Sequence, residues 1–149
     1  MDILYTAIQH AHSGLRWVVL ILLVAAIIKA ASKRRGGSVY PGKDSLALFA
    51  FISTHIQLLL GLVLYLWLSP KFKFDGDTMS NAVSRFYAVE HLVGMLFGIA
   101  LITAGYIRAK KQAELNKGWK TIGTFYLFGL LVIVASIPWP FRELGAGWF

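Results

Sequence analysis

The chain has 149 residues and a formal net charge of +8; 57% of its residues are apolar, only 15% are charged, and none is cysteine. This composition excludes an ordinary soluble globular domain and indicates a protein that needs lipid as its solvent. Without cysteine, disulfides, iron–sulfur clusters and thiolate metal sites are also excluded, so a metal centre must use histidine, carboxylate or methionine.

Four apolar segments are long enough to cross a bilayer, whose hydrocarbon core of about 30 Å needs roughly 20 helical residues. They cover residues 4–28, 46–68, 85–107 and 121–137. No stretch between them is long enough to build its own core, so we expect a single transmembrane domain over residues 1–149. The predicted fold class is an all-α membrane protein, a four-helix bundle.

The first segment carries His10, His12 and Arg16. It lacks a basic start and a basic run follows it, so we expect it to be a span and not a cleaved signal peptide. An ionisable group in hydrocarbon costs about 2.5–3.5 kcal/mol, and such groups generally face the bundle interior with a partner or a task. Arg16 is predicted to pair with Glu90, to reach the headgroups, or to raise the potential of a nearby cofactor. His10 is expected to be a hydrated interfacial histidine.

The second segment contains His55 and Gln57 near mid-membrane. Hydrogen bonds within the bundle would satisfy His55 without any function. Three other interpretations stay open: a second cofactor, a pairing with His91, or contact with a quinone headgroup.

The third segment holds Arg85, Glu90 and His91, followed by Gly94 and Gly98. The glycines either leave room for a flat ring beside His91 or form a small-xxx-small pattern for helix packing. Arg85 lies about 9 Å further out than His91 and is placed to hold a haem propionate. Glu90 is predicted to neutralise Arg16, to orient His12, or to pass protons to a quinone.

The loops give the topology. Basic residues follow the first segment (Lys33, Arg34, Arg35 and Lys43) and the third (Arg108, Lys110, Lys111, Lys117 and Lys120), whereas the middle loop balances Lys71 and Lys73 against Asp75 and Asp77. Loops rich in Lys and Arg stay in the cytoplasm. We therefore predict an up-down-up-down bundle in the bacterial cytoplasmic (inner) membrane with both termini periplasmic. Charges placed in this way indicate lipid, and not nucleic acid, as the partner.

The fourth segment ends at Pro138 and Pro140, which disfavour further helix. Aromatic residues at the outer ends of the segments are typical of the headgroup layer. They are Trp67, Phe72, Phe74, Trp139, Phe141 and Trp148.

Depth in the membrane separates the histidines. Counted from each segment's midpoint at about 1.5 Å per residue, His12 lies roughly 6–9 Å and His91 roughly 7–8 Å on the outer side, whereas His55 lies about 3 Å on the inner side. The first and third helices of such a bundle are diagonal, so their inner faces point at each other. The sequence therefore predicts His12 and His91 as the axial ligands of one b-type haem.

Four motifs are distributed along nearly the whole chain: residues 12–17 (HSGLRW), 54–65 (THIQLLLGLVLY), 85–91 (RFYAVEH) and 137–142 (IPWPFR). They resemble a family of small four-span proteins of Bacteroidetes-type bacteria labelled "cytochrome B". The resemblance implies an inner-membrane protein expected to bind b-type haem, with His12, His55 and His91 as the positions of interest.

The leading hypothesis is haem-mediated electron transfer to or from quinone or a respiratory partner. A rival is a non-catalytic anchor or assembly subunit of a larger complex, whose polar residues satisfy one another. A second rival is a proton-coupled carrier that uses Glu90, His55 and Arg16; the uninterrupted spans argue against it, because carriers favour broken helices. No hydrolytic or transferase motif is present.

Overall fold

The computed structural model describes residues 2–68, 76–113 and 117–148. Its spanning helices are α1 (Asp2–Arg35), α2 (Ser45–Val63) continued by η1 (Leu64–Leu68), α3 (Ala82–Arg85) continued by η2 (Phe86–His91) and α4 (Leu92–Lys111), and α5 (Gly118–Ser136); a short η3 (Pro140–Arg142) follows. The prediction of four helices long and apolar enough to cross a membrane is confirmed. Lys71, Phe72, Lys73, Phe74 and Asp75 lie outside the described residues.

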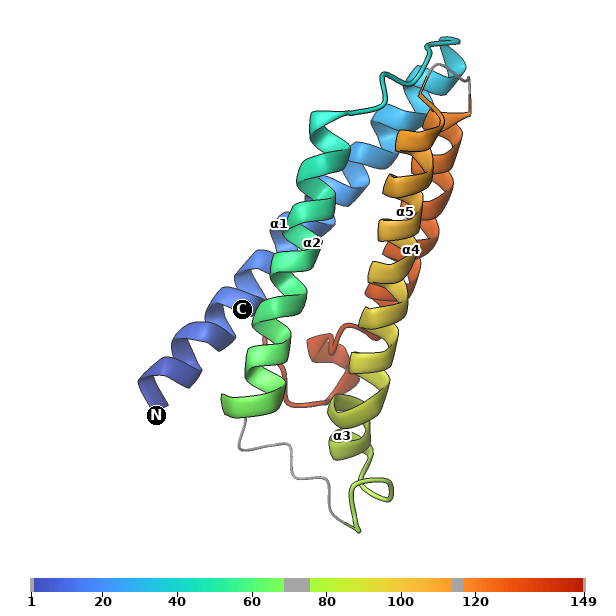
Figure 1. Cartoon of the computed structure of the whole chain (residues 1–149). Coiled ribbons are helices and arrows are strands. Elements are labelled where there is room, and N and C mark those ends of the chain that lie inside the picture. Colours follow the sequence, from blue (N-terminus) through green and yellow to red (C-terminus); the bar gives the residue numbers. More distant parts are fainter. Residues whose placement is uncertain (1, 69–75, 114–116, 149) are drawn as a thin grey trace.

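The helices alternate in direction and form a bundle (Figure 1). α1 packs against α2 and α5, α4 packs most closely against α5, and α2 meets α4 only loosely. α1 and α4 are therefore diagonal, as the sequence predicts. Large apolar side chains such as Phe49, Phe97 and Phe128 remain exposed on the outer faces, which suits a bilayer. The side of the membrane on which the termini lie stays a prediction.

Spans two and three run as continuous helices, but their backbone is not α-helical throughout. Spans two and three each contain a π-helical stretch, η1 and η2, at the same end of the bundle. The Tyr65 hydroxyl of η1 donates a hydrogen bond to the Ala88 carbonyl of η2 at 3.1 Å. Stretches of π-helix are frequent at functional sites. Here they border the cavity described below.

Glycines allow α4 and α5 to pack at a short distance from each other. A Cβ on Gly98 would lie 2.8 Å from Ile133 Cγ1 and 3.1 Å from the Gly129 carbonyl oxygen, and a Cβ on Gly129 would lie 3.0 Å from the Gly98 carbonyl oxygen. A Cβ on Gly94 would lie 2.0 Å from Ser136 Oγ. Of the two interpretations of the pattern, these contacts support small-xxx-small packing.

The opposite end of the bundle is held by Asp44 and Tyr40. Asp44 caps α2 by accepting a hydrogen bond from the Ala47 amide at 3.0 Å, and it pairs with Lys29 of α1. Tyr40 is fully buried, with its ring packed edge-on against Trp119. Its hydroxyl has no hydrogen-bond partner among the described residues. Burial raises the pKa of Tyr40 to about 12.

Replacement of Gly98 by valine should separate α4 from α5. The new side chain meets a backbone oxygen that cannot shift, and overpacking of this kind costs about 1–3 kcal/mol. We expect the midpoint of thermal unfolding in detergent to fall by several degrees. Gly14→Val is the matched control, because its Cβ would meet nothing within 4 Å. An unchanged midpoint for Gly98→Val would contradict the packing described here.

Tyr40→Phe should change the response to alkali. The unfolded side chain ionises near pH 10, about two pH units below the folded one, so the folded state alone keeps this proton between pH 10 and 12. The free energy of unfolding of the wild-type protein should therefore fall between pH 10 and 12 by up to about 2–3 kcal/mol. We expect Tyr40→Phe to be at least as stable as wild type at pH 7 and to lose less stability above pH 10, measured by thermal unfolding. A variant with the alkaline loss of wild type would refute this.

Candidate functional site

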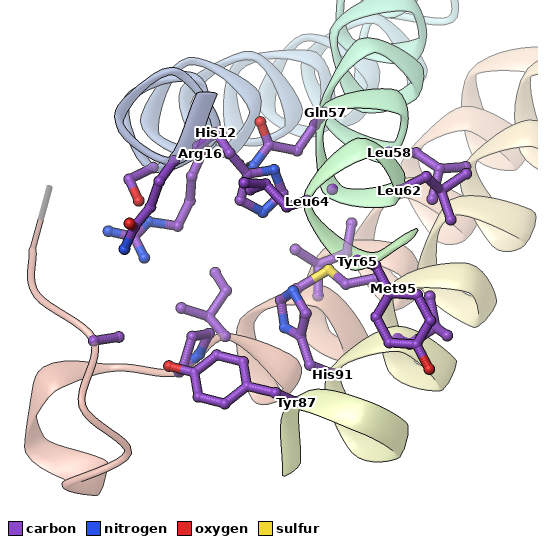
Figure 2. Close-up of a pocket in the computed structure, with 18 of the residues that line it drawn as sticks. His12, Arg16, Gln57, Leu58, Leu62, Leu64, Tyr65, Tyr87, His91 and Met95 are labelled. Carbon is purple, nitrogen blue, oxygen red and sulfur yellow. Dashed lines mark hydrogen bonds between the residues drawn. The ribbon is translucent and has the colours of Figure 1, made fainter. Parts of the chain in front are cut away.

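A cavity of about 190 Å³ lies between α1, α2, η2 and α4 at the end of the bundle away from the basic loops. Figure 2 shows its labelled residues. Its walls are mainly apolar and include Leu20, Leu58, Leu62, Met95, Ile99 and Ile133. Its polar lining residues include His12, Arg16, Gln57, Tyr87 and His91. An apolar cavity with a few converging polar groups is typical of a ligand site.

His91 is oriented by the end of α5. Its Nδ1 lies 2.7 Å from the carbonyl oxygen of Ser136. That carbonyl is free because the residue four positions later is Pro140, which has no N–H to donate. A carbonyl only accepts, so Nδ1 carries the proton, and in the neutral ring Nε2 keeps its lone pair. This bond to a backbone carbonyl is the usual way of orienting a histidine that binds a metal.

His12 lies against Gly61 of α2. A Cβ on Gly61 would lie 3.0 Å from His12 Cε1, so the missing side chain provides the space for the ring. Gln57 Nε2 donates a hydrogen bond to the His12 carbonyl at 2.7 Å, which links α2 to α1. His12 Nδ1 is buried and has no hydrogen-bond partner among the described residues. The His12 ring is therefore positioned by packing against Gly61, and its Nδ1 makes no hydrogen bond to the described residues.

The two imidazoles project toward each other from diagonal helices (Figure 2). Their ring centroids are 6.4 Å apart, and their planes meet at 75°. Two metal–imidazole bonds of about 2.0–2.1 Å plus two ring radii of roughly 1.1 Å give a separation of roughly 6 Å. The centroid distance is thus one that two rings sharing a metal atom would have, and it also lies in the roughly 4.5–7 Å range of an edge-to-face ring contact.

Arg16 also borders the cavity. Its Nη2 donates to the carbonyl oxygen of Trp148 at 2.6 Å, and Trp17 Nε1 donates to the same oxygen at 3.1 Å. The guanidinium carbon lies 5.4 Å from the centre of the Trp17 ring and 5.7 Å from that of Trp139. These contacts hold the C-terminal segment beside the cavity, where Gly145, Ala146 and Gly147 form part of the lining.

The predicted ion pair between Arg16 and Glu90 is wrong. Glu90 Oε1 instead accepts a hydrogen bond from Arg85 Nε at 2.8 Å. The π-helical turn of η2 explains this pairing, because it brings residues five apart onto one face. Neither Arg85 nor Glu90 lines the cavity, so the contacts do not support Arg85 as a propionate ligand or Glu90 as a partner of His12.

His55 is hydrogen-bonded within the bundle. Its Nδ1 lies 2.7 Å from the Phe51 carbonyl oxygen and its Nε2 lies 3.2 Å from Thr103 Oγ1. His55 does not line the cavity, so the interpretation of a structurally satisfied histidine is the one that its contacts support. His10 is exposed on α1.

The contacts do not support Gly94 and Gly98 as residues that make room beside His91. Neither glycine lines the cavity, and a Cβ on either would meet α5. Gly61 of α2 makes room for the His12 ring instead.

Several residues of the site are not predicted by the sequence analysis: Gly61, Tyr87, Ser136 and the segment 145–148. Pro140, four residues after Ser136, is a signal that could have identified the free carbonyl. Tyr87 Oη donates to the Leu144 carbonyl at 3.1 Å, a contact between residues far apart in the sequence that no local pattern indicates.

Comparison of this chain with known protein families, with curated proteins and with solved structures finds no match. Within the described residues, no group of three or more His, Cys, Asp or Glu side chains is arranged to hold a metal ion. The function is therefore inferred from the site itself.

Proposed function

We propose that this protein is a b-type cytochrome of the bacterial cytoplasmic membrane, with His12 and His91 as the two axial ligands of one haem. The observation that carries the proposal is the pair of facing imidazoles, whose centroids are 6.4 Å apart in an apolar cavity between diagonal helices. The resemblance of four motifs to the "cytochrome B"-labelled family, which stays a prediction, favours the same assignment.

The small number of side chains able to bind a metal favours a macrocyclic cofactor. His12 and His91 would be the two side chains that hold the metal, and the described residues supply no third His, Cys, Asp or Glu to the group. A porphyrin brings its own four nitrogen ligands, so the protein needs to add only two. Leu58, Leu62 and Met95 offer the ring apolar walls.

Binding of a macrocycle requires the cavity to widen, because ligand pockets commonly measure about 300–1,000 Å³ and this cavity measures about 190 Å³. The contact between α2 and α4 is the least extensive between neighbouring helices, so separation there would lose the least packing, although it would strain the Tyr65–Ala88 and His55–Thr103 hydrogen bonds. α4 and α5 stay together through their glycines, which keeps the Ser136 carbonyl at His91 Nδ1.

The residues of the chain have separate tasks in this proposal. His91 presents Nε2, since Nδ1 is held by Ser136. His12 approaches from α1 and is located by Gly61 and Gln57. The apolar lining excludes water from the site. Bound haem would supply a one-electron couple, and the proposed electron partner is membrane quinone or a respiratory subunit.

Removal of either ligand should abolish haem binding of the bis-histidine type. We expect purified wild type, reconstituted with haem, to give the reduced-minus-oxidised spectrum of a low-spin b-type centre, and His12→Ala and His91→Ala to lose it. His55→Ala and His10→Ala are matched controls that should retain it, because neither residue lines the cavity. A wild-type spectrum with protein absorption alone would favour the anchoring role, and a loss confined to His55→Ala would show that the wrong helices were paired.

Gly61→Leu should interfere with His12 directly. The new side chain would meet the His12 ring, and a penalty of about 1–3 kcal/mol corresponds to roughly fivefold or more in haem affinity. Gly14→Leu adds the same side chain to α1, two residues from His12, where a Cβ meets nothing within 4 Å. We expect haem titration to show weak binding only for Gly61→Leu. Equal affinities for the two variants would refute the role of Gly61.

A further inference from the structure

The positive charge of Arg16 is not balanced by an acidic side chain in the part of the chain that the structure describes. The ion pairs there are Lys29 with Asp44 and Arg85 with Glu90. Arg16 instead contacts a backbone carbonyl and the faces of two tryptophan rings, all of them neutral. A charge within a membrane span generally has a partner or a task.

Arg16 still has hydrogen-bonding capacity. A guanidinium has five N–H donors. Nη2 is used on Trp148, whereas Nε is buried and has no partner within the described residues. Carboxylates bind arginine through two parallel hydrogen bonds, which uses donors of this kind. The side chain is therefore able to bind an acidic group without losing a contact to another acid.

Its position ties this capacity to the ligand site. Arg16 is four residues after His12, on the same face of α1, and both line one cavity. Arg85, which the sequence analysis favours as a propionate ligand, is occupied by Glu90 and lies outside the cavity lining.

We infer that Arg16 binds a carboxylate of the ligand, so that the cavity selects an amphipathic ring with an acidic edge. This inference rests on the proposed function for the identity of the ring, which makes the acidic groups the propionates of a porphyrin. The apolar part of the ring lies among Leu58, Leu62 and Met95, and the acidic edge lies toward the C-terminal segment.

The test compares metal-free protoporphyrin IX with its dimethyl ester, because the two share one ring and neither contains iron for the histidines to bind. Affinities are measured by fluorescence titration of the purified protein in detergent. We expect wild type to bind the free acid about tenfold or more tightly than the ester, the range expected of a hydrogen bond between charged groups. Arg16→Gln should lose this preference and keep its affinity for the ester. Arg85→Gln is the matched control and should retain the preference.

Equal binding of acid and ester by wild type, no binding of the acid, or a preference that persists in Arg16→Gln would overturn the inference. Palmitate carries a carboxylate on a flexible chain; if it displaced protoporphyrin at a similar concentration, the site would be one for lipid acids, which also overturns it.

The outcome is separable from that of the proposed function. An Arg16-dependent preference for the acid together with no bis-histidine spectrum on addition of iron protoporphyrin would leave the inference standing and refute the cytochrome. A histidine-dependent spectrum of equal strength with haem and with its dimethyl ester would do the reverse.

Discussion

The end of α5 is the constraint on which the site depends. Proline at positions 138 and 140 leaves the carbonyls of Val134 and Ser136 without the N–H that would continue the helix. Side chains donate to the last carbonyls instead: Trp139 and Arg142, from the segment after α5, to Val134 and Ala135, and His91, from another helix, to Ser136. The bond that satisfies the helix end therefore also fixes the tautomer and direction of His91.

Packing and chemistry meet at the contact between α4 and α5. Ser136 provides a carbonyl to His91, and its hydroxyl group occupies the space that a side chain at position 94 would fill. The glycine at position 94 thus allows the end of α5 to come within hydrogen-bonding distance of the imidazole. Gly94 therefore affects the position of His91, which is one helical turn away, by letting the two helices come close.

The bundle and the apposition of His12 with His91 follow from sequence, because span length, loop charge and helical rise are local quantities. The hydrogen-bond partners of Arg85, Glu90 and Arg16 do not follow from the sequence. The first two depend on a π-helical turn that apolar composition does not reveal, and Arg16 depends on a C-terminal segment that folds back over α1. The packing of Gly94 and Gly98 against α5 does not follow from the sequence for a third reason. A row of small residues on a helix can meet either of two neighbouring helices, and periodicity does not say which one.

The limited contact between α2 and α4 indicates a route by which the proposed haem would enter the cavity. Gly61 and Leu62 on one side of the cavity and Met95 and Ile99 on the other belong to these two helices. Haem is sparingly soluble in water and partitions into lipid. If the proposed haem binds in this cavity, it would enter sideways from the bilayer and not from the aqueous compartment.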